Sequence, residues 1–261
     1  MMNLLVTLDS NYVMPLTALL RSIMKSNPDS EFTIYIAHSS LTEQDFEKIN
    51  ASVDLSRTEI CPIVISGEMM ADAPVLKRIT KETYYRLLAH EYLPESVERV
   101  LYIDPDTVVI KPLDELYNID FGDNVIAGST HVFSIVRRFN LKRLSLPFSA
   151  RYLNAGVLMM NIEKMRTMYS SEDIFEFIRL NSNDLLLGDQ DVINALYGRL
   201  SIALKPQLYN CDEKICRRYR LKEKDVRRDT VIVHFNGSKK PWKEEKYKGI
   251  LKPFWDEANC N

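Results

Sequence analysis

The chain has 261 residues, of which 46% are hydrophobic and 27% charged, and its formal net charge is −2. This composition is ordinary for a folded globular protein and excludes disordered, collagenous and disulfide-scaffold chains. No run approaches the roughly 18 apolar residues of a membrane-spanning helix. Charge is spread unevenly, since residues 205–261 carry a net +6 and the remainder −8, and the basic end favours an anionic partner.

The first half of the chain alternates predicted strands with predicted helices. Apolar runs and helical spacing place strands at 3–8, 32–37, 59–64 and 100–103, and helices at 13–24, from 42 onward and at 83–93. The first residues indicate a strand rather than a signal peptide, because they lack a basic start and soon reach Asp9. Thr42 is predicted to cap its helix, with Asp45 at the third helical position. Such alternation indicates parallel βαβ units, whose ligands bind beyond the carboxyl ends of the strands.

The second half is less regular. Strands are predicted at 125–129, 152–160, 201–204 and 230–235, helices at 172–180 and 190–196, and the basic segment 214–228 is expected as helix or loop. With 8 glycines and neither a GxGxxG nor a GxxxxGKS/T sequence, the chain does not fit Rossmann dehydrogenases or P-loop NTPases. The four cysteines match no zinc pattern; Cys211 and Cys216 could form a disulfide but are expected to be reduced.

The sharpest chemical signal is the sequence VLYIDPD at residues 100–106. An apolar strand there delivers Asp104 and Asp106, and strand alternation points both carboxylates the same way. Paired oxygens at a strand end suit a hard divalent cation that also binds phosphate. A solvated acidic turn is the alternative, because Asp-x-Asp alone is common.

A second signal is the sequence HFNGSKKPW at residues 234–242. A neutral His234 could complete the coordination sphere of Mn²⁺. Lys240 could neutralise a diphosphate, and Gly237 would let backbone N–H groups approach a phosphate. A core histidine beside a basic turn is the alternative, and the Asp-x-Asp sequence in the same chain favours the metal.

Two further segments place polar groups where a ligand could bind. Asp189, Gln190 and Asp191 precede a predicted helix; they offer acceptors and a donor for sugar hydroxyls, or simply a helix cap. Asn154 and Gly156 interrupt a predicted apolar strand, where glycine allows close approach of a ligand. Asn154 could equally satisfy a buried backbone group.

Polar side chains also follow the first predicted strand, and an arginine lies on the helix predicted at 83–93. Asp9 could accept the N3–H of a uracil and Tyr12 could stack on its ring, or Asp9 or Ser10 could cap a turn. Arg86, one turn after Thr83, could face a phosphate or a carboxylate. Taken alone, Arg86 is more simply interpreted as a surface arginine.

Taken together, these segments resemble the retaining glycosyltransferases of family 8, which include bacterial lipopolysaccharide galactosyl- and glucosyltransferases and glycogenin. The shared patterns are Thr-Tyr-x-Arg-Leu, Leu-Tyr-x-Asp-x-Asp, Asn-Ala-Gly-Val-Leu, Asp-Gln-Asp and His-x-x-Gly-x-x-Lys-Pro-Trp, running from Thr7 to Trp242. Each is weak alone and the set is specific. The resemblance implies an α/β GT-A fold with a mainly parallel central sheet flanked by helices, a UDP-sugar donor, and Mn²⁺ with Mg²⁺ as the alternative.

The resemblance also implies a role for each matching residue. The metal ligands would be Asp104, Asp106 and His234. UDP would be bound by Thr7, Asp9, Asn11, Tyr12, Gly237 and Lys240, and the donor sugar by Arg86, Asn154, Asp189 and Gln190. Asp189 and Gln190 are the expected catalytic residues, with Gln190 near the β face of the anomeric carbon.

The expected chemistry is transfer of a hexose with retention of configuration. Lys240 and the metal would neutralise the leaving UDP, and an acceptor hydroxyl would attack the sugar centre. Because the amide of Gln190 is a poor nucleophile, we expect attack from the leaving-group face, with a UDP phosphate oxygen taking the proton. His131 stands where the similar galactosyltransferases carry an acid, so glucose, galactose and another hexose stay open as donors.

Three other functions compete with this interpretation. Residues 104–108 also fit the nucleophile motif of haloacid-dehalogenase-type phosphatases, with Asp104 as nucleophile and Asp106 beside it, although that motif normally follows the first strand of its fold. A catalytically silent UDP-sugar-binding protein would carry the same binding groups. No dedicated nucleic-acid partner is expected, because segment 214–228 contains Glu223, Asp225 and a single aromatic residue.

The sequence divides into an expected catalytic domain, 1–242, and a short basic and aromatic extension, 243–261. Tyr247, Phe254 and Trp255 could form the apolar face of an interfacial helix, which leaves weak peripheral membrane contact open, or a solvated terminal helix. The expected location is cytoplasmic, with the inner face of the membrane as the place of any such contact.

The acceptor is expected to be a glycan, glycolipid or cell-wall precursor that the sequence does not specify. Loops such as 66–78 are expected to border it and to close over the donor. The arginines at 217, 218 and 220 are expected to lie near an anionic acceptor.

Overall fold

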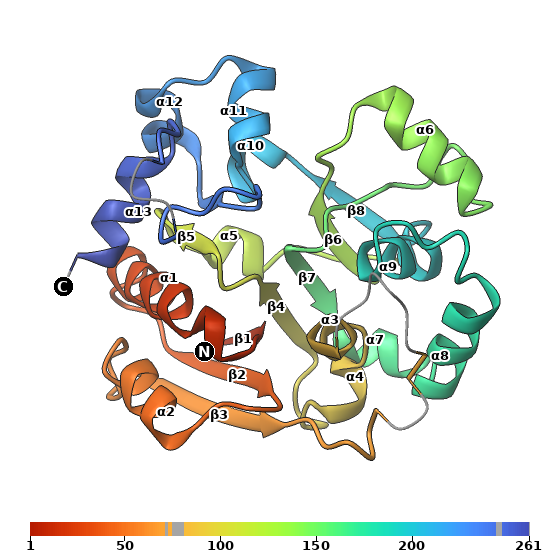
Figure 1. The fold of residues 1–261 in the computed structure, drawn as a ribbon, viewed down its shortest axis with the longest axis horizontal. Coiled ribbons are helices and arrows are strands. Elements are labelled where there is room, and N and C mark those ends of the chain that lie inside the picture. Colours follow the sequence, from red (N-terminus) through yellow and green to blue (C-terminus); the bar gives the residue numbers. More distant parts are fainter. Residues whose placement is uncertain (71–72, 75–80, 244–246, 261) are drawn as a thin grey trace.

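A seven-stranded sheet forms the centre of the fold (Figure 1). The computed structural model describes residues 1–70, 73–74, 81–243 and 247–260, apart from the side chains of 81–83. The strands lie in the order β3 (Thr58–Val64), β2 (Phe32–His38), β1 (Met2–Thr7), β4 (Arg99–Ile103), β7 (Val157–Asn161), β6 (Ile126–Ser129) and β8 (Ser201–Leu204). Neighbouring strands are parallel except where β7 pairs with β4 and with β6. The predicted α/β fold with a mainly parallel sheet is confirmed.

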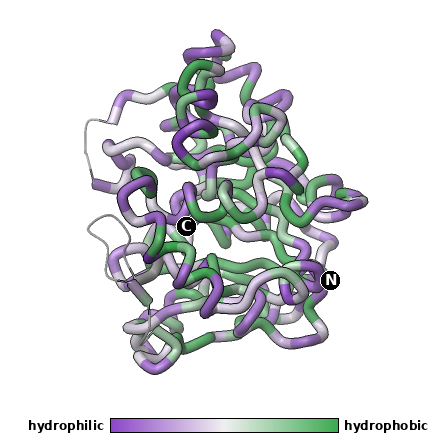
Figure 2. The backbone as a smooth tube through the Cα atoms, turned by 90° about the vertical axis from the view of Figure 1, so that its right-hand side faces the viewer, coloured by the Kyte–Doolittle hydropathy of each residue, from purple (hydrophilic) through white to green (hydrophobic). Residues whose placement is uncertain are grey.

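Strand alternation sends side chains into two apolar layers, one on each face of the sheet. In β1, for example, Leu4 and Val6 face one layer and Leu5 faces the other. The first layer is covered by α1 (Val13–Ser26), α2 (Glu43–Asn50) and α5 (Asp114–Tyr117). The second is covered by α3 (Lys81–Leu87), α4 (Ala89–Tyr92), α7 (Ile162–Arg166), α8 (Ser171–Leu180) and α9 (Asp189–Tyr197). Hydrophobic segments therefore run through the middle of the molecule (Figure 2), as buried parallel strands require.

Local capping signals act where they were predicted. The Thr42 hydroxyl accepts from the backbone N–H of Asp45, and the Asp45 carboxylate accepts from that of Thr42, which forms a capping box at the start of α2. The helix expected at 83–93 is divided at Leu88 into α3 and α4. Helix α6 (Ser134–Arg143) was not predicted, because its apolar residues do not follow a core-facing period.

A second, two-stranded sheet holds the two chemical signals together. β5 (Thr107–Val109) pairs antiparallel with β9 (Ile232–His234), and His234 stands opposite Thr107. β9 falls within the predicted strand at 230–235, whereas β5 is too short for a sequence pattern to reveal. This pairing brings the end of β9 to the turn that contains the Asp-x-Asp sequence.

The C-terminal part packs into the body of the protein. It contains α10 (Pro206–Tyr209), α11 (Glu213–Tyr219), α12 (Glu223–Asp229) and α13 (Lys252–Asn259), so the basic segment forms two helices. Tyr247, Phe254 and Trp255 are buried in an apolar cluster with Val108 and Val233 of the small sheet. The interfacial-helix hypothesis and the solvated-helix alternative are therefore both wrong for these side chains. Within the described residues, no helix has the length and apolar character needed to cross a membrane.

Two other expectations need correction or lie outside the description. The strand expected at 152–160 begins only at Val157, so Asn154 and Gly156 lie in a turn before the strand rather than inside it. The Asn154 side chain accepts a hydrogen bond from the backbone N–H of Gly156, which turns the chain there. Part of the loop expected to border the acceptor, residues 71–72 and 75–78, lies outside the described residues.

Candidate active site

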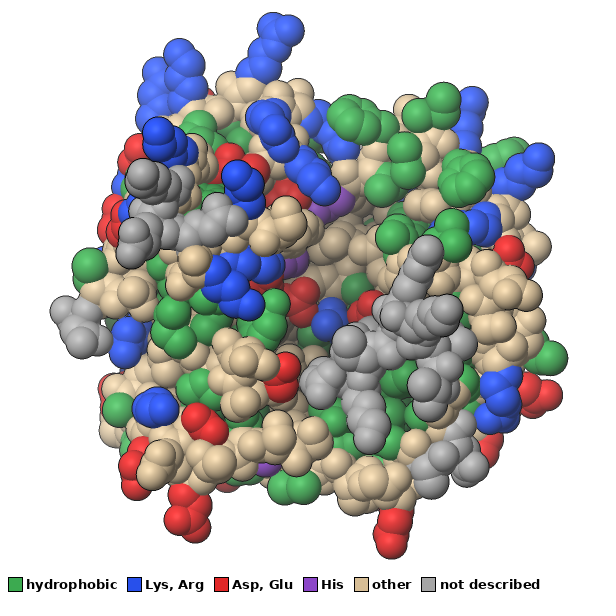
Figure 3. Space-filling model, viewed as in Figure 1, with side chains coloured by type: hydrophobic (Ala, Val, Ile, Leu, Met, Phe, Trp, Pro, Cys, Tyr) green, Lys and Arg blue, Asp and Glu red, His purple; other side chains and the backbone are tan. Residues whose placement is uncertain are grey.

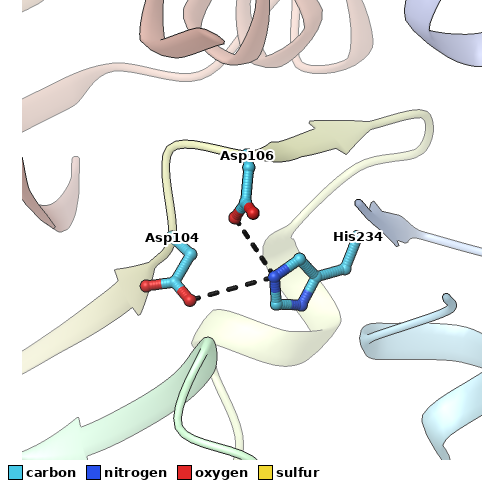
Figure 4. A group of neighbouring side chains, drawn as sticks. All are labelled: Asp104, Asp106 and His234. Carbon is cyan, nitrogen blue, oxygen red and sulfur yellow. Dashed lines mark hydrogen bonds and ion pairs between the residues drawn. The ribbon is translucent and has the colours of Figure 1, made fainter. Parts of the chain in front are cut away.

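The two aspartates lie in the turn between β4 and β5, directly after the carboxyl end of a central strand. The Thr107 hydroxyl donates to the carbonyl oxygen of Asp104 at 2.8 Å, which fixes the turn. Because β9 pairs with β5, His234 faces both carboxylates (Figure 4). One ligand atom each of Asp104, Asp106 and His234 lies within 4.8 Å of the others. The structure thus brings together the three residues that the sequence predicted as metal ligands.

Charges within this cluster are strongly coupled. His234 Nε2 lies 3.2 Å from Asp106 Oδ1 and 3.8 Å from Asp104 Oδ2, and Lys240 Nζ lies 2.6 Å from Asp106 Oδ2. Burial alone would raise the pKa of Asp106, but His234 and Lys240 lower it well below its usual range. Burial alone would lower the pKa of His234, but the two carboxylates raise it. His234 and Lys240 therefore contact carboxylate oxygens whose charge a cation could balance.

The surroundings of the cluster fit a divalent metal ion. His234 Nδ1 lies 2.7 Å from Asn210 Oδ1, so a proton on Nδ1 leaves the Nε2 lone pair directed at the carboxylates. Gly156 leaves the space that these groups occupy: a Cβ there would lie 2.4 Å from His234 Cε1 and 2.7 Å from Asp104 Oδ2. Two carboxylates and an imidazole form a donor set suited to Mn²⁺ and related cations. Asn210 was missed by sequence analysis, since no motif marks it.

Arg86 connects the Asp-Asp-His cluster to the residues predicted for the donor sugar. Its Nη1 lies 3.0 Å from Asp104 Oδ1, its Nε lies 3.0 Å from Asp189 Oδ2, and the guanidinium stacks over the Tyr102 ring at 4.5 Å. The Tyr102 hydroxyl also donates to Asp104 Oδ1 at 2.6 Å. Arg86 is mostly buried, so the surface interpretation is wrong, and of the two proposed partners it faces carboxylates.

A pocket of about 470 Å³ opens beside this network, and Figure 3 shows it as a hollow between two raised parts of the surface. Its wall contains all the predicted metal and donor-sugar residues: Asp104, Asp106, His234, Arg86, Asn154, Asp189 and Gln190. Asn154 Nδ2 donates to Gln190 Oε1 at 3.1 Å, which orients the carboxamide. Burial raises the pKa of Asp189, although Arg86 opposes the shift.

Asp191 has a different role from the two residues before it. It is fully buried, its carboxylate is held by Arg143 at 2.8 Å and by the Tyr152 hydroxyl, and it accepts the Leu187 N–H at 2.7 Å. The interpretation of Asp191 as part of a sugar-binding acceptor set is therefore wrong, because its oxygens are occupied inside the protein. Of the three residues Asp189, Gln190 and Asp191, the first two line the pocket and the third does not.

The residues expected to bind uridine lie at the end of β1. Asp9 caps a short 3-10 helix, η1 (Ser10–Tyr12), by accepting from the backbone N–H of Asn11 at 2.8 Å. Thr7 is buried, and its hydroxyl lies 3.1 Å from the Tyr102 hydroxyl. Tyr12 packs edge-on against Trp242 with ring centroids 6.2 Å apart. The capping role that sequence analysis left open for Asp9 is thus present, and it leaves the uridine role as a prediction.

The two residues predicted for the diphosphate differ in how the structure uses them. Lys240 donates to Asp106 and, at 2.7 Å, to the carbonyl oxygen of Phe235, so its charge is held at the Asp-Asp-His cluster. A Cβ added to Gly237 would meet only the carbonyl oxygen of Lys239, at 3.9 Å. Packing within the chain therefore does not require glycine at 237, and its phosphate role stays a prediction.

His131 occupies the wall of the pocket with a carboxylate behind it. Its Nδ1 lies 3.4 Å from Asp212 Oδ2, and its Nε2 lies 2.8 Å from the carbonyl oxygen of Asn210. Burial opposes the shift, but His131 lowers the pKa of Asp212. Asp212 also lines the pocket, so an acid is present near the position where sequence analysis noted its loss. No local pattern marks Asp212, since it reaches the site from the start of α11.

Solved structures share this architecture. A galactosyltransferase, LgtC, crystallised with donor and acceptor sugar analogs, superposes with a TM-score of 0.83 over 99% of this chain and 95% of that one at 23% identity. The glycosyltransferase GlyE of Streptococcus pneumoniae gives a TM-score of 0.71 over 100% of this chain and 61% of its own at 19% identity. These matches confirm the fold as GT-A.

Sequence comparison then gives the family. The chain belongs to glycosyl transferase family 8, whose model matches residues 3–246. A lipopolysaccharide 1,2-glucosyltransferase of Escherichia coli is 26% identical over 90% of this chain and 71% of its own length. A lipopolysaccharide 1,3-galactosyltransferase of Salmonella typhimurium is 24% identical over 92% and 72%. The resemblance inferred from the motifs is confirmed, and the chain is an enzyme that transfers a sugar.

Proposed function

We propose that the chain transfers a hexose, glucose or galactose, from a UDP-sugar to a glycan, glycolipid or cell-wall acceptor with retention of configuration. The observation that carries this proposal is the convergence of Asp104, Asp106 and His234 beside a pocket that also contains Arg86 and Asp189. Similar enzymes named for glucose and for galactose transfer support both donors. The proposed cation is Mn²⁺, with Mg²⁺ as the alternative, held by the three clustered residues.

The arrangement of charge explains how the chain's own residues would serve this transfer. A bound cation would neutralise the diphosphate as UDP leaves. Lys240, already at the cluster, would supply a second positive charge on the same side. We propose that Thr7, Asp9, Asn11 and Tyr12 hold the uridine and that the backbone at Gly237 contacts the diphosphate.

Arg86, Asp189 and Gln190 would position the sugar over this charge. Arg86 fixes Asp189 by an ion pair, and Asn154 fixes Gln190 by a hydrogen bond, so both pocket-facing groups are held before a ligand arrives. Because Gln190 is an amide, we propose attack from the leaving-group face, with a UDP oxygen taking the acceptor proton. A trapped covalent glycosyl-enzyme would contradict this step.

The comparisons exclude one of the competing functions, the phosphatase, and leave the silent binding protein to be tested. Family membership and the position of the Asp-x-Asp turn after β4, the fourth strand, remove the phosphatase alternative. A silent binding protein would give the same ligand binding without release of UDP, so turnover separates the two. Residues 1–242 are proposed as the catalytic part and 243–261 as an extension, of which Tyr247, Phe254 and Trp255 pack on the small sheet. The proposed place of action is the cytoplasm, where the acceptor could be reached at the inner face of the membrane.

Thermal unfolding with UDP, UDP-glucose, UDP-galactose and UDP-N-acetylglucosamine, each with Mn²⁺ or with a chelator, tests the proposal. A ligand at 100 times its Kd adds about 2.7 kcal/mol to the native state, which raises the Tm by about 5–10 °C in a domain of this size. We expect that rise only with Mn²⁺, and the ranking of sugars identifies the donor. Absence of any shift in the folded protein would contradict the proposal, and UDP release with Mn²⁺ excludes the silent alternative.

A further inference from the structure

Helix α6 and the loop after it expose apolar side chains to solvent. Five large hydrophobic residues there are between 42% and 77% exposed: Phe133, Ile135, Val136, Phe139 and Phe148. The helix is held from below, since Leu141 is buried in a small cluster with Ala150 and Tyr152. An apolar patch of this kind on a folded protein marks an interaction site.

The same segment is free of negative charge. No Asp or Glu occurs between Asp123 and Glu163. Arg138 and Lys142 are exposed on α6, and no ion pair involves either of them within the described part of the chain. Cationic side chains therefore border the apolar ones directly, although the whole chain carries a net charge of −2.

Helix α11 extends this surface across the pocket. The Arg218 guanidinium stacks on the Phe133 ring at 4.0 Å, which joins the start of α6 to α11. Arg217 and Arg220 are exposed on the same helix or at its end. Figure 3 shows hydrophobic side chains gathered over α6 on one side of the hollow and Lys and Arg side chains over α11 on the other. We name these exposed side chains of α6, its following loop and α11 the α6–α11 surface.

The α6–α11 surface borders the active-site pocket. Val132, directly before Phe133, lines the pocket, as does exposed Lys214 of α11. Arg218 donates to the backbone carbonyl oxygen of His131, a third lining residue, at 2.5 Å. A partner bound to this surface would therefore lie at the entrance through which an acceptor must pass.

We propose that the α6–α11 surface docks the enzyme on an anionic lipid bilayer. Aromatic and aliphatic side chains of α6 would enter the boundary between headgroups and acyl chains, and the flanking cations would meet anionic headgroups. A second copy of this chain fits less well, because a two-fold interface would place the same cations against each other. The docking goes beyond the proposed function; combined with it, the pocket opens toward the bilayer and takes a lipid-linked acceptor.

Sedimentation with vesicles tests the docking. The unaltered chain is expected to bind vesicles of phosphatidylglycerol mixed with phosphatidylcholine, and to bind phosphatidylcholine alone at least about tenfold more weakly. Ile135→Asp with Phe139→Asp is expected to reduce binding to the mixed vesicles by at least about tenfold. The matched control is Leu55→Asp with Val64→Asp, which alters two side chains of similar exposure, 60% and 65%, and should bind as the unaltered chain does.

A charge variant tests the headgroup contact separately. Arg138→Glu with Lys142→Glu is expected to reduce binding to the mixed vesicles by about tenfold or more, and raised salt should reduce binding of the unaltered chain. Lys48→Glu, on the exposed side of α2, is the control. The Mn²⁺-dependent thermal shift with UDP should be unchanged in all these variants, which shows that they fold and separates this test from that of the proposed function.

Several outcomes would overturn the docking. The docking is wrong if the unaltered chain fails to bind anionic vesicles, or if it binds vesicles of phosphatidylcholine alone as strongly as the mixed vesicles. It is also wrong if the Ile135→Asp and Phe139→Asp double variant binds the mixed vesicles as strongly as the unaltered chain does. A dimer in solution that this variant abolishes would assign the surface to a second copy instead. If vesicle binding is found while UDP gives no shift, the proposed function fails and the docking stands.

Discussion

Two charge clusters meet at the start of α9 and differ in how their carboxylates are satisfied. Asp189 faces the pocket and shares Arg86 with Asp104, next to Asp106 and His234. Asp191, two residues later, faces the interior. Both of its oxygens are bonded to Arg143, and Tyr152 and the Leu187 N–H add further hydrogen bonds. We call the first group the open cluster, because its carboxylates face the pocket and share their cations. We call the second group the closed cluster, because its carboxylate oxygens are all bonded inside the protein.

The difference shows what distinguishes a reactive site from a structural ion pair built of the same residue types. In the closed cluster every acceptor is occupied, so nothing is left for a ligand. In the open cluster three carboxylates converge with a histidine and an arginine at the wall of a pocket, and Lys240 pairs with one of these carboxylates. A dication and a diphosphate could enter such an arrangement by replacing contacts that the side chains now make with each other.

The largest expected effect is on the open cluster. Asp106→Asn removes a proposed metal ligand and the anion that holds Lys240, so sugar transfer should fall by at least about 10³-fold. Transfer is measured as UDP release from the preferred donor. A chelator should reduce transfer by the unaltered chain as much as the Asp106→Asn substitution does.

Exposed Asp229 supplies the control for this change. Asp229→Asn should transfer sugar at the rate of the unaltered chain, because the exposed Asp229 carboxylate forms an ion pair with surface Arg228. Transfer by Asp106→Asn within tenfold of the unaltered rate would show that the open cluster is not the metal site.

In the closed cluster the expected effect is on stability. Arg143→Ala leaves the Asp191 carboxylate buried and without its cation, which should lower the free energy of unfolding by about 3–5 kcal/mol. Urea unfolding followed by circular dichroism measures this. Arg143→Met combined with Asp191→Leu should recover most of the loss, since the charge is removed as well.

A double variant as unstable as Arg143→Ala would mean that the pair itself, rather than the uncompensated charge, stabilises the fold. The comparison between a structural and a reactive cluster would then lose its basis.

Gly156→Ala tests how closely the open cluster is packed. A methyl group at this position would meet His234 and Asp104, so these two side chains must move and transfer should fall by about tenfold or more. Asp229→Asn, the control already used for Asp106→Asn, is the control here as well. Equal transfer rates for the two variants would show that His234 and Asp104 do not need their present positions.

The smallest effect is expected for an ion pair outside both clusters. Arg227 contacts Glu223 and Glu257 on the surface, and Arg227→Ala should lower the free energy of unfolding by less than about 1 kcal/mol, because solvent screens exposed charges. Urea unfolding beside Arg143→Ala makes the comparison direct. A loss as large as that of Arg143→Ala would show that burial does not decide the strength of these pairs.

Sequence reasoning located what is local and missed what depends on distant contacts. Asp104, Asp106 and His234 were found because strand ends and turns leave a pattern in the sequence. Asn210 and Asp212 were missed, since their roles arise from contacts with His131 and His234 that the fold creates.

The errors have the same origin. Asp191 was grouped with the sugar-binding residues because only its distant partner Arg143 shows that it is structural. The strand expected at 152–160 was too long because the Asn154 side chain turns the backbone. Burial of Tyr247, Phe254 and Trp255 was not foreseen, since their partners lie on β5 and β9.

Mn²⁺ binding followed by electron paramagnetic resonance tests the central claim most directly. In the presence of UDP we expect one Mn²⁺ site in each chain, present in Asp229→Asn and lost in Asp106→Asn. Binding of Mn²⁺ by folded Asp106→Asn with the affinity of the unaltered chain would contradict the claim that the open cluster holds the metal.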